Sequence, residues 1–439
     1  MKNLFFKDNS FEDFVKNFDQ TSTLISLEEV RNSVSLILKE IKLRKDDALI
    51  SFSKKFDNYD CNSIDDLTFS KDNFKDAYDS LDKEIIVNLE FLKERILNFH
   101  SKIPLESWSY EDEAFSSFGQ IVRPIKRVGL YAPGGTAIYP SSILMTAVLA
   151  SLAGVKEIIL AFPPCNAELT KLMLATAHIG GVSEAISIGG AQSIGAMAFG
   201  TESIKKVDKI FGPGNQYVAE AKRQVYGLVG IDSLTGPSEV MIIADQSANP
   251  EFVAADLLAQ AEHGVNSACF LVSIGPDVKN NVLDALKAQL ENIDRSEIVL
   301  ESFKKYSYLI EARDLSQAKE VCNLIHPEHL QIILDNASEI VLENFSAGAI
   351  FVGASNTAVL GDYCAGPSHV IPTSGASRFS SQVSIRDFFT TSSFTKISEN
   401  FDSEELQKVI SNSIDIANLE GLSAHAKALE LRLKKSNSN

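Results

Sequence analysis

The feature that most constrains the fold of this chain is a regular alternation of short apolar runs with amphipathic segments of helical length. It begins near Arg127, and the apolar runs are rich in β-branched residues. Strands that alternate with helices of this length form βαβ units and mainly parallel sheet. The expected strands comprise residues 128–131, 158–162, 185–188, 209–211, 240–244, 268–274, 308–310, 331–334 and 349–352. Because these are too many strands for one tidy sheet, the sequence predicts an α/β protein with two lobes.

Helical segments flank this region on both sides. Residues 27–42 and 72–103 carry apolar residues at three- and four-residue spacing between charges, which is typical of helices with one buried stripe. Residues 403–434 are again helical in pattern and strongly polar. We therefore expect a helical N-terminal segment and a helical C-terminal tail around the two lobes.

Charge and hydropathy exclude several kinds of partner. The 439 residues carry a net charge of −17 with histidine neutral, and such a surface repels the phosphates of nucleic acids and anionic membranes. The N-terminus has acidic residues where a signal peptide needs an apolar core. The longest nearly apolar stretch, residues 143–155, is shorter than the ~20 residues that cross a bilayer. We expect a cytoplasmic protein with no nucleic-acid or membrane partner.

The cysteines are widely spaced and odd in number, and no CxxC pair occurs. Neither a disulfide framework nor a cysteine zinc site is indicated by this pattern. Most of the thiols are expected to be buried and inert. The five are Cys61, Cys165, Cys269, Cys322 and Cys364.

Two glycine-rich turns each follow an expected strand and lead towards a helix, at residues 131–135 and 211–215. Such turns let the backbone approach a phosphate at a helix N-terminus. Neither is a P-loop, since no Lys-Ser/Thr follows, and the second is only a partial GxGxxG with Tyr217 in place of the third glycine. Each turn alone is more often just a tight connection between strand and helix than a phosphate site.

Gln260 and His263 are three residues apart near the end of an expected helix, and Gly264 follows as a stop signal. This spacing places both side chains on one helix face, so they could bind one metal or one ligand. A histidine near a helix C-terminus is also explained by the helix dipole. The pattern leaves both interpretations open.

Glu328 and His329 follow Pro327 and begin an expected strand. An acid and an imidazole side by side at a strand edge are suited to general acid–base chemistry near neutral pH. The alternative is a solvated loop cluster, which the apolar strand that follows makes less attractive.

Asp362 and His369 lie in a long glycine-rich loop, and Glu420 and His425 lie near the C-terminus. Histidine nitrogens, a carboxylate and an amide oxygen could together hold a hard cation. Such a set would be Gln260, His263, Asp362 and His425. Ligands so far apart cannot be joined by spacing alone.

From about Val122 to His425 the chain closely resembles the histidinol dehydrogenase family. The resemblance rests on long, specific segments, whereas the N-terminal region is much less distinctive. The segments are VGLYAPGGTAIYPSS, GGAQSIGAMAFGT, KIFGPGNQYVAEAKRQV, DSLTGPSEVMIIAD, DLLAQAEHG, HPEHLQI, GDYCAGPSHVIPTSGASRFSS and EGLSAHA.

The resemblance implies the NAD-dependent oxidation of L-histidinol to L-histidine through L-histidinaldehyde, the last step of histidine biosynthesis. It also implies a role for each matching residue. The zinc ligands would be Gln260, His263, Asp362 and His425, and the acid–base pair would be Glu328 and His329. Ser238, His369 and Glu420 would join these residues as substrate contacts, and Tyr131, Gln192 and Asn215 would contact NAD.

The resemblance further implies two incomplete Rossmann-like lobes and a homodimer whose C-terminal tail completes the partner's site. Glu420 and His425 would then serve the other subunit. The expected division is an N-terminal helical segment (1–30), a zinc and substrate lobe (31–127 with 238–385), an NAD lobe (128–237) and a dimerisation tail (386–439).

Three alternative hypotheses for the function remain open at this point. A paralogue could oxidise another alcohol on the same scaffold, although the complete ligand set and Glu420 favour histidinol. A binding or scaffold protein without activity is a second rival, and the intact acid–base pair speaks against it. An aldehyde dehydrogenase with a cysteine nucleophile is the third, because the α/β architecture could serve either enzyme.

Overall fold

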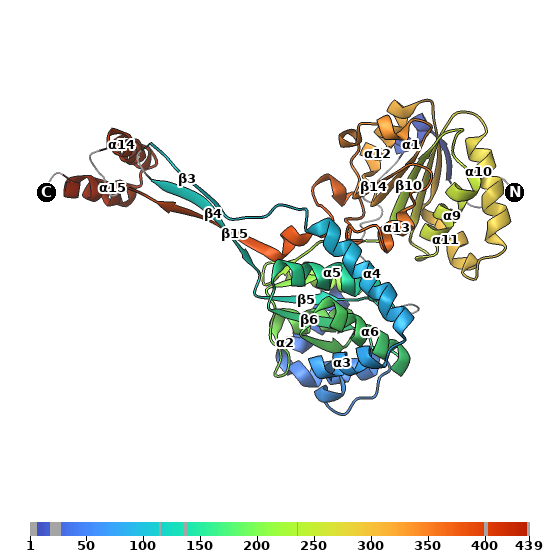
Figure 1. Cartoon of the computed structure of the whole chain (residues 1–439), viewed down its shortest axis with the longest axis horizontal. Coiled ribbons are helices and arrows are strands. Elements are labelled where there is room, and N and C mark those ends of the chain that lie inside the picture. Colours follow the sequence, from blue (N-terminus) through green and yellow to red (C-terminus); the bar gives the residue numbers. More distant parts are fainter. Residues whose placement is uncertain are drawn as a thin grey trace. The chain divides into compact units, whose positions relative to one another are not determined.

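The computed structural model describes residues 7–17, 28–113, 116–134, 138–234, 236–398 and 403–436. The chain forms two compact units. The first comprises Met1–Ile103 and Ile125–Phe388, and the second comprises Pro104–Pro124 and Phe389–Asn439. Figure 1 labels elements of both units where there is room.

The first unit contains one sheet with the order β2-β7-β6-β5-β8-β9. Its neighbours pair in parallel, except that β2 is antiparallel to β7. The chain steps outward from β5 through β6 to β7 and then crosses to β8 on the other side of β5. The strands are β2 (Thr68–Phe69), β5 (Arg127–Tyr131), β6 (Glu157–Phe162), β7 (Glu184–Ser187), β8 (Lys209–Phe211) and β9 (Gly230–Ile231). This reversal of order places a topological switch point between β5 and β8.

Helices cover both faces of the first sheet. One set contains α5 (Pro140–Ala153) and α6 (Ala167–Gly180), which pack together, and the other contains α7 (Gly190–Phe199) and α8 (Gln216–Val225). Local signals set their ends: the Asn166 side chain caps α6, and Gly154 and Gly181 take the left-handed conformation that ends α5 and α6.

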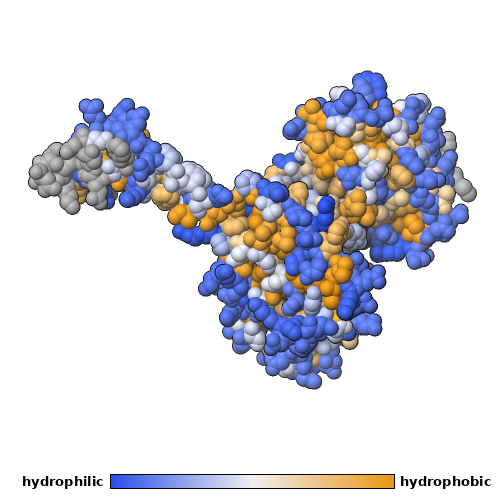
Figure 2. All heavy atoms as spheres, in the orientation of Figure 1, coloured by the Kyte–Doolittle hydropathy of each residue, from blue (hydrophilic) through white to orange (hydrophobic). Residues whose placement is uncertain are grey.

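The N-terminal helices pack on this same sheet. Helix α2 (Glu28–Phe56) packs on α7 and α8, α3 (Lys71–Ser80) on α6, and α4 (Lys83–His100) on α5. These helices therefore pack mainly on the helices of the first sheet, and Arg95 of α4 also donates to the Cys364 carbonyl over 2.9 Å. An amphipathic stripe shows that a helix packs on something but does not say on which sheet. Figure 2 shows mostly hydrophilic residues over the outer side of α2 and α3.

The second sheet of the first unit is entirely parallel, with the order β1-β12-β11-β10-β13-β14. It has its own reversal of order, between β10 and β13. The strands are β1 (Lys7–Ser10), β10 (Glu239–Ala244), β11 (Ala268–Ile274), β12 (Tyr308–Ala312), β13 (His329–Ile333) and β14 (Ala349–Val352). The expected N-terminal helical segment therefore contains an edge strand as well as helix α1 (Phe11–Asn17).

Two apolar cores enclose the second sheet. One core joins it to α9 (Pro250–Ala261), α10 (Val278–Leu290) and α11 (Ser296–Tyr306). The other contains residues of α1 and α12 (Leu315–Ile325). The fold class expected from the sequence, α/β with two parallel-rich lobes, is confirmed.

The second unit is a small antiparallel sheet followed by two helices. Strand β4 (Ser117–Pro124) pairs with both β3 (Trp108–Glu111) and β15 (Phe389–Lys396). Helices α14 (Glu404–Leu419) and α15 (Ser423–Ser436) pack on each other around Leu406 and Ile410. The helical tail is confirmed, and residues 104–124 join it. Among the described helices, none has the length and hydropathy that a bilayer crossing requires.

Candidate active site

The Glu328–His329 pair is positioned by a tight turn between α12 and β13. His326 ends α12 in the left-handed conformation, with φ of 51°, and Pro327 prevents the helix from continuing. Hydrogen bonds fix this turn, because His326 Nδ1 lies 2.8 Å from Ser346 Oγ and Ser377 Oγ donates to the His326 carbonyl. Glu328 and His329 are consequently held at the amino end of β13, and both are buried.

The neighbouring strand β10 holds both side chains. Ser238 Oγ and the Glu239 N–H donate to Glu328 Oε2 over 2.6 and 2.8 Å. The His329 Nδ1 lies 3.1 Å from the carbonyl oxygen of Glu239. A carbonyl only accepts, so Nδ1 carries the proton of the neutral ring and Nε2 is free to accept one. Within the described residues this buried Nε2 has no hydrogen-bond partner.

Burial perturbs the carboxyls next to this histidine. It raises the pKa of Glu328, an effect that the nearby His329 and the Ser238 hydrogen bond partly oppose. Burial, with the Glu328 charge second, raises the pKa of Glu239 to about 8. Glu239 was missed by sequence reasoning. The available signal was an acid directly before the apolar run of β10.

His369 connects the pair to other expected site residues. Its Nδ1 donates to the Asp362 carbonyl over 2.8 Å, and Ser142 Oγ lies 3.0 Å from its Nε2. Burial lowers the pKa of His369, the Asp362 charge opposes this, and His329 and His263 lower it further. The side chains of Asp362, His329 and His263 therefore all lie near enough to His369 to affect its charge. Ser142, from the start of α5, is a second residue that sequence reasoning missed.

Three residues of the expected zinc set, Gln260, His263 and Asp362, lie in the first unit. Gln260 is buried in the last turn of α9, and its Nε2 has no partner in the described residues. His263 follows one turn later and is exposed, and Asp362 ends α13 (Ala358–Asp362). His425 and Glu420 lie in the second unit, where both are exposed. Imidazole nitrogens, carboxylate oxygens and amide oxygens are donors that suit zinc.

No group of three or more His, Cys, Asp or Glu side chains in the described part of the chain is arranged to hold a metal ion. Of the four expected ligands, only His263 and Asp362 are residues of these types in the first unit.

The expected NAD contacts lie around the switch point of the first sheet. Tyr131 ends β5 and is buried, and its hydroxyl accepts a hydrogen bond from the Gly190 N–H over 3.2 Å. Burial raises the pKa of Tyr131 to about 12, so the phenol is neutral. Gln192 is buried in α7, and Asn215 caps α8 through the N–H groups of Tyr217 and Val218.

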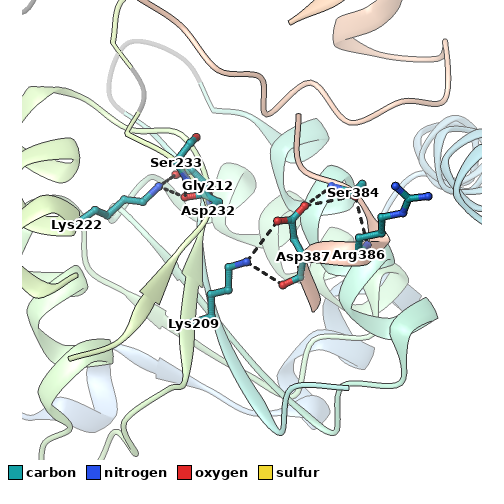
Figure 3. Close-up of polar contacts among 8 residues, drawn as sticks. All are labelled: Lys209, Gly212, Lys222, Asp232, Ser233, Ser384, Arg386 and Asp387. Carbon is teal, nitrogen blue, oxygen red and sulfur yellow. Dashed lines mark hydrogen bonds and ion pairs between the residues drawn. The ribbon is translucent and has the colours of Figure 1, made fainter. Parts of the chain in front are cut away.

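A buried ion pair braces the second glycine-rich turn (Figure 3). Lys222 Nζ contacts Asp232 and donates to the Gly212 carbonyl, while the Gly212 N–H donates to Asp232 over 2.7 Å. Gly212 has φ of 117°, and a Cβ there would overlap the Tyr131 carbonyl. The turn is thereby fixed against the end of β5.

A second polar cluster in Figure 3 fixes the end of the first unit. Lys209 Nζ donates to the Asp387 carbonyl over 2.9 Å and pairs with its carboxylate. The Phe211 and Phe388 rings stack at 4.1 Å on the same strand end.

The cysteines are free, and three of them are buried. Burial raises the pKa of Cys269 above its usual range and that of Cys322 to about 12. Thiols in such surroundings are protonated and unreactive near neutral pH.

Comparison with known proteins points to one family. The family model described as histidinol dehydrogenase matches residues 21–433. The histidinol dehydrogenase of Clostridium acetobutylicum is 42% identical over 407 residues, which cover 92% of this chain and 93% of that protein. That of Dechloromonas aromatica is also 42% identical and covers 93% of each chain. The crystal structure of histidinol dehydrogenase from Elizabethkingia anophelis matches with a TM-score of 0.90, 34% identity and 99% of both chains covered.

Proposed function

The chain belongs to the histidinol dehydrogenase family, NAD-dependent oxidoreductases of histidine biosynthesis, and we propose that it oxidises L-histidinol to L-histidine through L-histidinaldehyde. The observation that carries the chemical part of this proposal is the state of His329. Its Nδ1 is held by the Glu239 carbonyl, and its Nε2 is buried, unprotonated in the neutral ring and without a partner in the described residues. Such a nitrogen is a ready proton acceptor.

In the first oxidation, His329 Nε2 would accept the hydroxyl proton of histidinol, and bound NAD would supply the hydride acceptor for the adjacent carbon. In the second, Glu328 would take a proton from the water whose oxygen adds to the aldehyde carbon. The protonated His329 would return its proton to the aldehyde oxygen, which completes the hydrate and leaves His329 neutral again. His329 would then remove a hydroxyl proton of the hydrate, a second NAD would supply the hydride acceptor, and the carboxylic acid would result. The raised pKa of Glu328 suits it to this exchange of protons.

Gln260, His263, Asp362 and His425 would hold a zinc ion, which would orient the substrate through its imidazole and amino nitrogens. His263 and Asp362 support this, since both act electrostatically on His369. Ser238, His369 and Glu420 would contact the substrate beside these ligands. The carboxylate of Glu420 suits the substrate ammonium.

Tyr131, Gln192 and Asn215 would contact NAD at the switch point between β5 and β8. Crevices at the carboxyl ends of strands, where the strand order reverses, are the usual dinucleotide sites of open α/β sheets. Residues 131–134 and 211–215 lie at this edge, and Asn215 opens α8.

A homodimer is part of the proposal, with Glu420 and His425 serving the partner's site. The second unit exposes large apolar side chains, which favours burial against another chain. They are Trp108, Tyr110, Ile397, Val409, Ile416, Leu419, Leu422 and Leu431.

The test is the product ratio of the full-length protein with zinc, NAD and a limiting amount of L-histidinol. We expect two molecules of NADH for each histidine, with histidine identified by mass spectrometry. One NADH with accumulated aldehyde would contradict the second step. No turnover of histidinol, with turnover of another alcohol, would support the paralogue.

A further inference from the structure

Asp57 is an acid that the proposed mechanism does not use, and it lies beside the proposed NAD site. It follows the last turn of α2 and faces the loop between β7 and α7. A Cβ on Gly189 would lie 3.3 Å from Asp57 Oδ1, so the carboxyl contacts this loop. Burial raises the pKa of Asp57 to about 6, against the lowering effect of hydrogen bonds from the Gly189 N–H and Gln192.

One oxygen of the Asp57 carboxyl lacks a hydrogen-bond donor among the described residues. Asp57 Oδ2 is buried, and no described residue gives it a hydrogen bond. A buried acceptor without a donor is costly and uncommon in folded proteins. The nearest side chains are those expected at the cofactor, because Gln192 bonds to Asp57 and the charge of Asp57 acts on Tyr131. A bound molecule with hydroxyl donors would satisfy the free oxygen.

The Asp57 carboxyl takes the place of an acid that other dinucleotide-binding folds carry at this edge of the sheet. In doubly wound dinucleotide-binding folds, an acid that follows the second strand accepts hydrogen bonds from the adenosine ribose. Here the second strand is β6, and Pro163, Pro164 and Cys165 follow it, so no carboxylate comes from that position. The Pro163 ring lies against both Gly134 and Gly189, between the ends of β5 and β7. Asp57 supplies a carboxylate to the same edge from α2.

We propose that Asp57 accepts hydrogen bonds from the adenosine ribose hydroxyls of NAD and selects against the 2′-phosphate of NADP. A ribose diol presents two donors to a carboxylate, whereas a phosphate there would meet a like charge. The two lysines just before Asp57 are engaged elsewhere: Lys54 pairs with Asp60 at 3.1 Å, and Lys55 lies 5.1 Å from the Phe56 ring centre. The inference rests on the proposed function, since it takes the β5–β8 switch point as the cofactor site.

The test compares the binding of NAD and NADP to the full-length, zinc-loaded protein by titration calorimetry at pH 8, where Asp57 is ionised. The variant is Asp57→Asn, which keeps the shape of the side chain. The control is Asp60→Asn, an acid three residues away whose side chain is 88% exposed. We expect Asp57→Asn to weaken NAD binding about tenfold or more, with NADP binding unchanged or tighter. Asp60→Asn should leave both affinities unchanged.

Three results would overturn the inference. The first is that Asp57→Asn binds NAD with an affinity within about threefold of the wild type. The second is that Asp57→Asn loses equal affinity for NAD and for NADP. The third is that the wild type binds NAD and NADP with the same affinity. Equal losses would indicate a structural role for Asp57. If the wild type binds neither dinucleotide, the proposed function fails as well; if it binds NAD and Asp57→Asn has no effect, only this inference fails.

A second measurement needs no variant and holds even if Asp57→Asn does not fold. Wild-type protein is titrated with ADP-ribose and with its 2′-phosphate, which differ only at the hydroxyl in question. The phosphorylated probe should bind about tenfold more weakly or worse. Equal affinities would overturn the assignment of Asp57 to the adenosine ribose.

Discussion

The imidazole Nδ1 of His329 lies 3.1 Å from the carbonyl oxygen of Glu239, on the strand next to its own. Glu239 also donates its backbone N–H to the Glu328 carboxylate over 2.8 Å. One residue of β10 therefore holds both members of the proposed acid–base pair, through backbone atoms that a side-chain substitution leaves in place. The parallel register of Val240 with His329 produces this arrangement at the amino ends of the two strands.

The Glu239 side chain gives a pH-dependent prediction. Its pKa is raised from 4.5 to about 8, so the folded protein keeps a proton there that the unfolded chain loses above pH 4.5. Stability from this group is full below pH 4.5 and is lost as the pH rises towards 8. The Glu239→Gln variant cannot ionise at this position. The difference between its free energy of unfolding and that of the wild type should therefore increase in its favour by ~1 kcal/mol or more from pH 5 to pH 8. Urea unfolding at both values measures this, and a difference independent of pH would contradict it.

The zinc assignment predicts a selective loss in His263→Ala. Removing one imidazole ligand should lower the zinc content of the purified protein, while NAD affinity stays near that of the wild type. Metal analysis and titration calorimetry give the two values. His178→Ala removes an exposed histidine of α6 and serves as the control. Equal zinc in His263→Ala and the wild type would exclude His263 as a ligand.

The buried Lys222–Asp232 pair predicts a large loss of stability. Both side chains are almost fully buried, so Lys222→Met leaves Asp232 as an uncompensated charge and should cost ~3–5 kcal/mol. Lys54→Met breaks an exposed pair and should cost ~0–1 kcal/mol. Urea unfolding of the full-length variants compares the two. Similar losses would mean that the Lys222 pair does not brace the Gly212 turn.

The cysteines should be dispensable. Cys165 and Cys364 are the two that are not buried, and Cys269 is held protonated in a core. Single alanine variants at these positions should keep activity near that of the wild type. A loss of ~10²-fold in kcat, in a variant that remains folded, would restore the mechanism with a thiol nucleophile.

The strands that could be predicted from the sequence are mainly the buried ones. All nine expected strands occur within a few residues of their expected places, because each is apolar and bounded by turns. Strand β3 has only four residues, all exposed, and β2 has only two, so both are too short to be predicted from a hydrophobic pattern. Residues 72–103 form two helices, because Asp82 caps a new one after Leu81.

For the site, too, only part could be predicted from the sequence, namely the residues that are close together along the chain. The spacing of Gln260 and His263 and the adjacency of Glu328 and His329 are local, and they could be read directly. Ser142 reaches His369 from 227 positions away, and Glu239 meets His329 only through strand pairing. Contacts of this kind are set by tertiary packing, which no local spacing encodes.

The most direct test of the account is the turnover of His329→Gln, with NAD affinity and zinc content measured on the same sample. If His329 Nε2 accepts the proton in both oxidations, kcat should fall by ~10²–10⁴-fold, while NAD affinity and zinc content remain near wild type. His178→Gln should keep full activity. A kcat of His329→Gln within about tenfold of the wild type, with zinc and NAD bound, would contradict the central role of this imidazole.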